Sequence, residues 1–380
     1  MTTSSNRRTV IAAAALLAAS GFTLAQGTPK ELPVGVFNGL TGSYAYGGVP
    51  IQNGIKLALE EANQKGLPGG AKFKIIEGDS AGDKAQAISL VNQFAKRDQV
   101  LMILGPTTSF EALGAAPVAN ELQVPLFANG SANDILATGP WAFKVQAYAT
   151  DIMGFLSKFT MEKLGAKRIT LITDQSNDGY VAQKAAFLKE VKAAGAQIVS
   201  DDSILGSDSN FLALATKVSN QDTDVVFVAA PAELSANLLI QMRQAGVDSK
   251  VKFVGPSTLA SLNFIKIGGK AVEGTYVVSD YAPNNPSPAN TAFVSAYTAR
   301  YKSPPDVWAA MGYTIGQLAA QAVQNAGPNP DRTKLRDEIG KLNKVPVVIG
   351  SGTWSVNGAR QPSYGGVLLQ VKGGTFATVQ

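Results

Sequence analysis

The stretch Leu32-Pro33-Val34-Gly35-Val36-Phe37, followed by Asn38-Gly39-Leu40-Thr41-Gly42, decides the fold, because a short apolar run ends in a glycine-rich loop. Apolar residues then recur every three or four positions from Ile51 to Ala62, which is the spacing of an amphipathic helix. A strand, a loop and a helix in this order are typical of a βαβ unit. We therefore predict a strand over 32–37 and a helix that packs against its sheet.

The same alternation of short β-branched runs and helical segments continues along the chain. Strands are predicted at 72–76, 101–104, 168–172, 196–199, 224–228, 251–254 and 272–279, with helices at 179–193, 208–219 and 232–245. Short apolar strands between helices indicate parallel sheets covered on both faces. Because this series of alternating strands and helices occurs twice along the chain, we predict an α/β protein with two Rossmann-like, doubly wound lobes.

Two later segments depart from this alternation. The proline-rich run 283–288 is either a surface loop or a connection that crosses back between the lobes. The stretch from Val347 onward carries several glycines and alternating Val and Leu, which favours a hairpin over another βαβ unit.

The first 25 residues have the pattern of a cleaved export signal. Arg7 and Arg8 form a basic start, residues 10–19 are apolar, and Thr23-Leu24-Ala25 offers the small residues that a signal peptidase reads. A buried helix or a membrane anchor are the alternatives, but the apolar run is shorter than the roughly 18–20 residues that span a bilayer. We predict cleavage after Ala25 and a periplasmic product.

Composition excludes several classes of function. The 380-residue chain is 45% hydrophobic and 16% charged, and it contains no Cys and no His. Nucleophilic systems that need Cys or His, zinc and haem sites built from them, and disulfides are therefore excluded. Without Arg7 and Arg8, the 33 basic and 28 acidic side chains leave a net charge of +3, with no basic cluster for nucleic acid. We expect no catalytic residue, no metal and no cofactor.

Four loops that follow predicted strands are candidates for ligand binding, because ligands of open α/β sheets bind beyond the carboxyl ends of the strands. These loops are 38–48, 105–111, 127–133 and 174–180. The first has glycines like a phosphate loop but lacks its Lys and Ser/Thr, so we exclude a nucleotide. In the second, Thr108 and Glu111 fit a helix capping box, and Thr108 and Ser109 could also form a carboxylate cradle. Turn formation alone explains the glycines of the first loop and Asn177-Asp178-Gly179 equally well.

In the order and spacing of these pieces the chain resembles the extracytoplasmic solute-binding proteins of branched-chain amino acid type ABC transporters. The resemblance covers essentially the whole mature chain. It rests on residues 34–42 with Asn53-Gly54, on Gly105-Pro106 with Thr108-Ser109 and Val124-Pro125, on 313–327 and on 350–358. It implies the type I periplasmic binding fold, in which two lobes joined by three crossovers close on a ligand. The implied lobes are 26–146 with 281–345, and 147–280 with 346–380.

Carried over residue by residue, the resemblance implies a set of ligand-binding residues. Thr108 and Ser109 should meet the ligand carboxylate beside Gly130 and Ser131, and Tyr46 should cover the ligand from the first lobe. The remaining implied positions, all of the second lobe or its entry, are Tyr148, Asp178, Tyr180 and Ser257.

One position departs from the amino-acid binders of the family. Ser257 stands where they tend to carry a Glu for the ligand's ammonium, and near the other acidic position only Asp151 could serve. An enclosed ammonium without a carboxylate would be costly. An aromatic or oxo acid is therefore as well suited as a branched-chain amino acid, although Asp178 could still meet an ammonium or a hydroxyl.

The expected protein is a monomeric, non-enzymatic binding protein that delivers a small, mainly apolar carboxylate to an ABC permease in the inner membrane. Two alternatives remain at this point. A ligand sensor would share the same fold, and a carboxylate-pair hydrolase would need two facing acids about 5–9.5 Å apart across the cleft.

Overall fold

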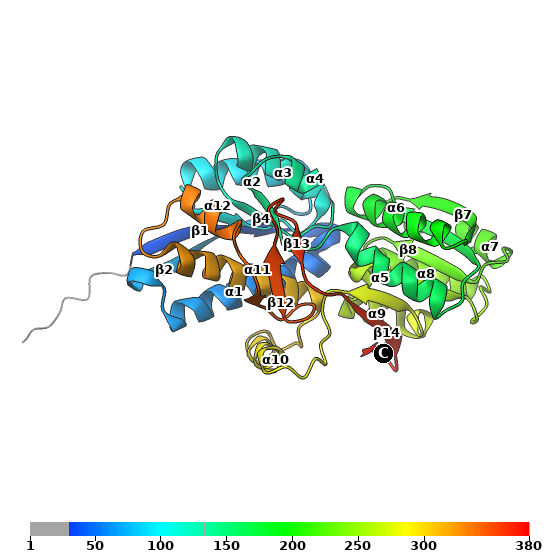
Figure 1. The fold of residues 1–380 in the computed structure, drawn as a ribbon. Helices are drawn as coiled ribbons and strands as arrows, with labels where there is room; N and C mark the ends of the chain where they lie inside the picture. The colour runs from blue at the N-terminus through cyan, green and yellow to red at the C-terminus, as the bar shows by residue number, and fades with distance from the viewer. Residues whose placement is uncertain (1–29, 133, 380) are drawn as a thin grey trace, which may run out of the picture.

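The computed structural model describes residues 30–132 and 134–379. The predicted signal segment, 1–25, lies outside the described residues. The described chain forms two lobes side by side, each built on its own sheet (Figure 1). This arrangement confirms the predicted α/β class with two doubly wound lobes.

The sheet of the first lobe has five parallel strands in the order β2-β1-β3-β4-β5. They are β1 (Glu31–Asn38), β2 (Lys72–Asp79), β3 (Met102–Leu104), β4 (Leu126–Ala128) and β5 (Ala142–Lys144). β3, β4 and β5 are fully buried, as short strands covered on both faces should be.

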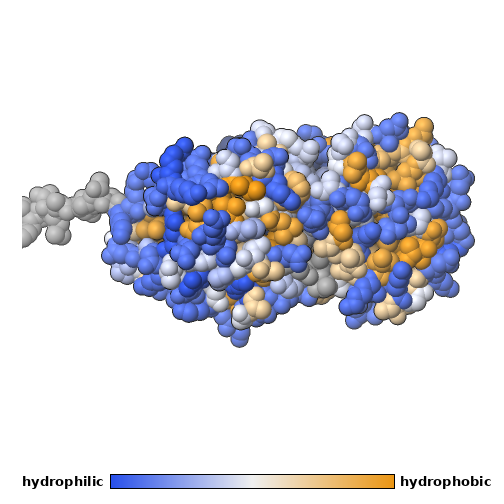
Figure 2. All heavy atoms as spheres, turned by 90° about the horizontal axis from the view of Figure 1, so that it is seen from above, coloured by the Kyte–Doolittle hydropathy of each residue, from blue (hydrophilic) through white to orange (hydrophobic). Residues whose placement is uncertain are grey.

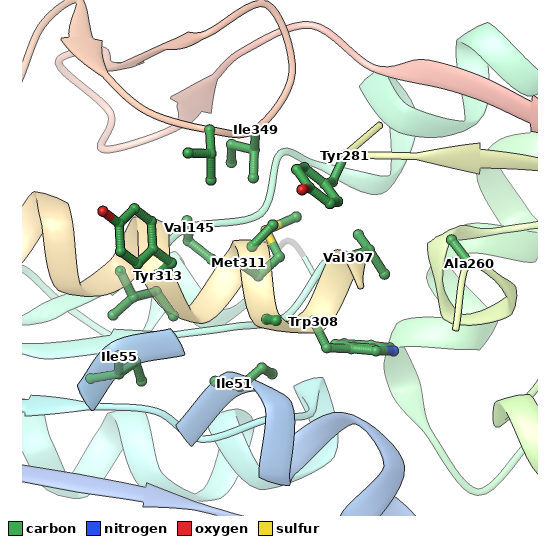
Figure 3. Close-up of a cluster of buried hydrophobic side chains, with 14 of the residues drawn as sticks. Ile51, Ile55, Val145, Ala260, Tyr281, Val307, Trp308, Met311, Tyr313 and Ile349 are labelled. Carbon is green, nitrogen blue, oxygen red and sulfur yellow. The ribbon is translucent and has the colours of Figure 1, made fainter. Parts of the chain in front are cut away.

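Helices cover both faces of this sheet. One face carries α1 (Ala45–Lys65) and α11 (Val307–Ala326), and the other carries α2 (Lys84–Asn92) and α3 (Ser109–Glu121), with α4 (Asp134–Ala137), α10 (Pro288–Tyr301) and α12 (Arg332–Ile339) at the periphery. α1 and α11 approach closely because Gly312 lies against the backbone of Ile51, where a Cβ would collide. Figure 3 shows the apolar side chains of both helices meeting in this core.

The sheet of the second lobe has seven strands in the order β15-β14-β10-β9-β8-β6-β7. They are β6 (Arg168–Asp174), β7 (Gln197–Ile204), β8 (Val225–Ala229), β9 (Lys252–Gly255), β10 (Tyr276–Ser279), β14 (Val367–Lys372) and β15 (Thr375–Thr378). β14 and β15 pair as an antiparallel hairpin, which confirms the prediction for the C-terminal stretch.

The helices of the second lobe also lie on both faces of its sheet. α5 (Ala149–Glu162) and α6 (Asp178–Ala193) pack on one face, and α7 (Leu212–Ser219), α8 (Ala232–Gln244) and α9 (Leu262–Gly268) pack on the other. α7 starts later than the predicted 208–219, and β10 is shorter than the predicted 272–279 because residues 269–272 form a 3₁₀ turn.

The chain crosses between the lobes three times. It passes from β5 to α5, returns from β10 to α10 through the proline-rich run 283–288, and crosses again before β14. Trp354, on the short strand β12 (Thr353–Val356), packs against Phe127 and donates its indole N–H to the carbonyl of Val145 at 3.0 Å. These contacts hold the segment around β12 against the first lobe before the chain reaches β14.

A buried carboxyl group connects all three crossovers. Asp280 accepts hydrogen bonds from Gln146 (3.3 Å) on the first crossover and from the Tyr364 hydroxyl (2.9 Å) on the third. Tyr364 also accepts the N–H of Ala147 at 2.9 Å. Burial raises the pKa of Asp280, and these bonds fix the hinge between the lobes.

Hydrophilic residues cover most of the face drawn in Figure 2, with apolar residues gathered in separate patches. Among the described residues, no helix is both long and apolar enough to cross a membrane.

Candidate functional site

A pocket lies between the lobes, at the carboxyl ends of strands from both sheets. The atom-free space between its lining residues is about 380 Å³, a volume that includes open solvent. The first lobe and the first crossover contribute Tyr44, Tyr46, Thr107, Thr108, Ser109, Asn129, Gly130, Ser131, Gln146 and Trp308, and the second lobe contributes Asn177, Gly179, Tyr180, Gln183 and Thr258.

The floor of the pocket in the first lobe is the start of α3. Thr108 caps this helix: its hydroxyl accepts the N–H of Glu111 (3.2 Å) and donates to the Glu111 carboxyl (2.8 Å). Ser80 donates a further bond to the same carboxyl. The predicted capping box is thus formed, and it commits the Thr108 hydroxyl to the helix.

Ser109 has a hydroxyl hydrogen that the fold does not use. Its Oγ accepts the N–H of Ala132 at 3.2 Å, and no described group accepts its hydrogen. Ser109 is the first residue of α3, where backbone N–H groups lack helical partners. Gly130 and Ser131, from the loop after β4, lie beside it in the pocket lining. Together these groups are suited to donate hydrogen bonds to an anion.

Hydrogen bonds across the cleft hold the two lobes together around the pocket. The hydroxyls of Tyr46 and Tyr180 are 3.3 Å apart, and Gln183 donates to the Ser131 hydroxyl at 3.1 Å. Burial raises the pKa of Tyr46 and of Tyr180 above the usual range and that of Tyr44 to about 12. The three phenols therefore stay protonated and remain hydrogen-bond donors.

Gly179 of the second lobe lies close to Ser109 of the first. A Cβ at this position would stand 2.8 Å from the Ser109 Oγ and 3.0 Å from the Asn177 Oδ1. Because glycine has no Cβ, the second lobe can pack directly against Ser109 of the first lobe.

Four lining residues each carry a buried polar atom that has no partner among the described residues. They are Oδ1 of Asn129, Oε1 of Gln183, Oγ1 of Thr258 and the indole Nε1 of Trp308. Figure 3 shows the Trp308 indole extending from α11 on the side of Ala260. Buried polar atoms are normally paired, so these four are available to a polar ligand.

The lining is electrically neutral. Its residues, as far as the chain is described, include no Asp, Glu, Lys or Arg. Aromatic rings, hydroxyls and amides make up most of it. Such a surface can solvate a carboxylate or hydroxyls, but it offers an enclosed ammonium no opposite charge.

Six of the nine residues expected from the sequence come together in this pocket: Tyr46, Thr108, Ser109, Gly130, Ser131 and Tyr180. Tyr148, Asp178 and Ser257 do not line it. The ring of Tyr148 lies 4.4 Å from the Lys144 ammonium, and Ser257 is buried, accepting a bond from Gln146 at 3.1 Å.

Helix capping explains the position of Asp178. Asn177 caps α6 by accepting the N–H of Gly179 at 2.8 Å. Asp178 is then the first helical residue and points to solvent, while Asn177 and Gly179 on either side line the pocket. Asp151, the other acid considered, is exposed and accepts a bond from Gln361 at 3.2 Å.

The sequence did not point to the other nine lining residues, which are Tyr44, Thr107, Asn129, Gln146, Asn177, Gly179, Gln183, Thr258 and Trp308. Most of them lie in or next to the four candidate loops, so their position after a strand was the signal. Gln183 and Trp308 lie on helices and belong to no recognisable motif.

The fold has two lobes joined by crossovers, and a neutral polar pocket lies between them at the ends of their strands. This arrangement is that of the two-lobed, hinged class of solute-binding proteins. The sequence profile of the family described as "Periplasmic binding protein" matches residues 31–375. The chain belongs to this family, which confirms the resemblance found in the sequence.

Individual relatives agree with this assignment. A Leu/Ile/Val-binding protein of Rhizobium johnstonii is 24% identical over 330 residues, which are 86% of this chain and 88% of the relative. A leucine-binding protein of Thermotoga maritima has a TM-score of 0.85 at 24% identity, covering 92% of this chain and 98% of that one. A solute-binding protein of R. palustris, solved with benzoate, has a TM-score of 0.83 at 24% identity, covering 92% and 95%. At this identity the solved structures show the fold alone.

Proposed function

We propose that this chain is the periplasmic substrate-binding component of an ABC importer, and that its ligand is a small carboxylate without an amino group. The chain would be exported with removal of residues 1–25, would bind the ligand between its lobes and would pass it unchanged to an inner-membrane permease. The observation that carries the ligand class is the neutral pocket, which combines free donors with no acidic partner for an ammonium.

The cradle supports a carboxylate. Ser109 supplies a hydroxyl hydrogen, and it stands at the start of α3, where backbone N–H groups lack helical partners. Each hydrogen bond to a charged group contributes roughly 1.5–3 kcal/mol. Micromolar affinity needs about 8 kcal/mol in total, which a few such bonds and one buried apolar group supply.

The remaining lining supports an aromatic or oxo acid. Tyr44, Tyr46, Tyr180 and Trp308 provide flat apolar surface, and the unpartnered atoms of Asn129 and Gln183 can accept bonds from hydroxyl substituents. The structural neighbour from R. palustris was solved with benzoate, so the fold accommodates an aromatic acid. The resemblance places Ser257 where amino-acid binders tend to carry a Glu for the ligand's ammonium, so this chain has a hydroxyl there in place of an acid.

Matched pairs of ligands test the proposal. Thermal unfolding is measured with phenylpyruvate and phenylalanine, with 4-methyl-2-oxopentanoate and leucine, and with benzoate. A ligand at 100 times its Kd stabilises by about 2.7 kcal/mol, so we expect a raised melting temperature with at least one acid and none with either amino acid. Stabilisation by leucine or phenylalanine but not by its oxo acid would contradict the proposed ligand class.

A further inference from the structure

Lys144 is a buried cation behind the ligand cradle. It is the last residue of β5, only 1% exposed, and its ammonium donates to the carbonyl of Ser131 at 3.0 Å and to that of Ala132 at 3.4 Å. The ring of Tyr148 covers it at 4.4 Å. Lys144 does not line the pocket, so its charge can reach a ligand only through other groups.

One peptide unit connects this charge to the cradle. The Ser131 carbonyl that accepts from Lys144 belongs to the same peptide as the Ala132 N–H, and that N–H donates to the Ser109 hydroxyl at 3.2 Å. Hydrogen bonds in series polarise one another. A positive charge at Lys144 therefore makes the Ser109 hydroxyl, which lines the pocket, a stronger donor.

We propose that Lys144 is a specificity-determining residue, whose charge acts through the peptide of Ser131 and Ala132 on Ser109 and selects anionic over neutral ligands. The inference rests on the proposed function, because it presumes a carboxylate at Ser109. It explains how a pocket lined by neutral residues favours an anion.

The surroundings of Lys144 make its charge dependent on pH. The titratable or charged groups around it are Asp151 on α5, Asp280 after β10 and the Tyr148 phenol, with Arg360 acting on that phenol. Burial lowers the pKa of Lys144 to about 7, against the opposing effect of Asp151 and Asp280. A bound anion would raise it again. The affinity for a carboxylate should therefore fall as the pH rises from 6 to 9, because the uncharged amine no longer polarises the cradle.

The experiment compares the unchanged protein with three variants by calorimetry between pH 6 and pH 9. The probe is whichever of benzoate, phenylpyruvate and 4-methyl-2-oxopentanoate binds the unchanged protein most tightly, together with its primary amide. For Lys144→Met we expect roughly tenfold weaker binding of the acid at pH 6, the scale of a charge acting without direct contact, with little change for the amide and a flat pH profile.

Lys144→Arg keeps a charge that does not titrate, so it should retain affinity and lose the pH dependence. Arg332→Met is the matched control, because Arg332 also donates to backbone carbonyls of the first lobe, those of Val100 and Ala95, but away from the cleft. It should bind the acid as the unchanged protein does.

Equal weakening of acid and amide by Lys144→Met, or no weakening, would overturn the inference while leaving the proposed function intact. If Lys144→Met does not fold, the pH profile of the unchanged protein decides: a fall toward pH 9 supports the inference and a flat profile overturns it. Binding of none of the three acids to the unchanged protein contradicts the inference and the proposed function together.

Discussion

Ser109 is the residue on which binding of the carboxylate most depends. Its hydroxyl accepts from Ala132 and keeps its own hydrogen for the ligand. Ser109→Ala removes that donor. We therefore expect the affinity for the acid to fall roughly tenfold or more, with little change in the free energy of unfolding. Titration calorimetry measures the affinity, with Ser219→Ala as the control, because the Ser219 hydroxyl donates to the Thr216 carbonyl on the second lobe, away from the pocket. Unchanged affinity would remove Ser109 from the cradle.

Gly179 permits the lobes to close, and this can be tested without removing a polar group. Gly179→Ala places a methyl group 2.8 Å from the Ser109 Oγ, so we expect weaker ligand binding and an unchanged midpoint of unfolding in the absence of ligand. Gly154→Ala is the matched control, because a Cβ there meets nothing within 4 Å. Ligand affinity equal in both variants would show that closure does not need glycine at 179.

At the level of single residues, the sequence predicts part of the pocket lining. Loops after strands are recognisable because parallel strands end at one edge of a sheet, and Thr108, Ser109 and Ser131 lie in such loops. Trp308 and Gln183 lie on helices, where their spacing is that of ordinary core or surface residues. Choosing Asp178 over Asn177 required knowing which of the two caps α6, and a difference of one residue decides whether a side chain faces the cleft.

Among the elements, α11 carries a titratable cap next to the site. Asp306 accepts the N–H of Ala309 at 3.0 Å, and burial raises its pKa to about 6, above the roughly 3.9 of an unfolded chain. The folded state therefore binds this proton more readily, and the stability that this group contributes is lost as the pH rises through 6. Asp306→Asn keeps the cap and removes the charge.

We expect Asp306→Asn to be more stable than the unchanged protein by about 1–2 kcal/mol at pH 7.5. The difference should shrink toward zero near pH 4, where the carboxyl is protonated. Urea unfolding at both pH values measures it, and other buried acids cancel in the comparison. A variant that is less stable at pH 7.5 would mean that the ionised carboxyl contributes more to the cap than its burial costs.

Strands and helices were predictable wherever the apolar period was regular, as in β1, β3 and β8. The later start of α7 and the shorter β10 follow from local turns at 206–211 and 269–272 that the apolar pattern does not show. Element type depends on periodicity over many residues, whereas an element's ends depend on single turn and cap residues.

For the whole molecule, the sequence predicted two lobes because the βαβ series is written twice. It gave no sign of the contacts by which one side chain, Trp354, holds the segment around β12 against the first lobe. The hinge is likewise made by contacts between residues far apart in sequence, such as Asp280 with Gln146 and Tyr364. Long-range contacts of this kind leave no local pattern.

The central claim is that two hinged lobes hold an anion by hydroxyl and amide donors and release it unaltered. A crystal structure of the complex with the tightest-binding acid of the matched-pair screen tests it most directly. We predict one carboxylate oxygen within hydrogen-bond distance of the Ser109 Oγ, beside Gly130 and Ser131, with an intact ligand between the tyrosines and Trp308. A carboxylate directed away from Ser109, or a chemically altered ligand in the cleft, would contradict the account.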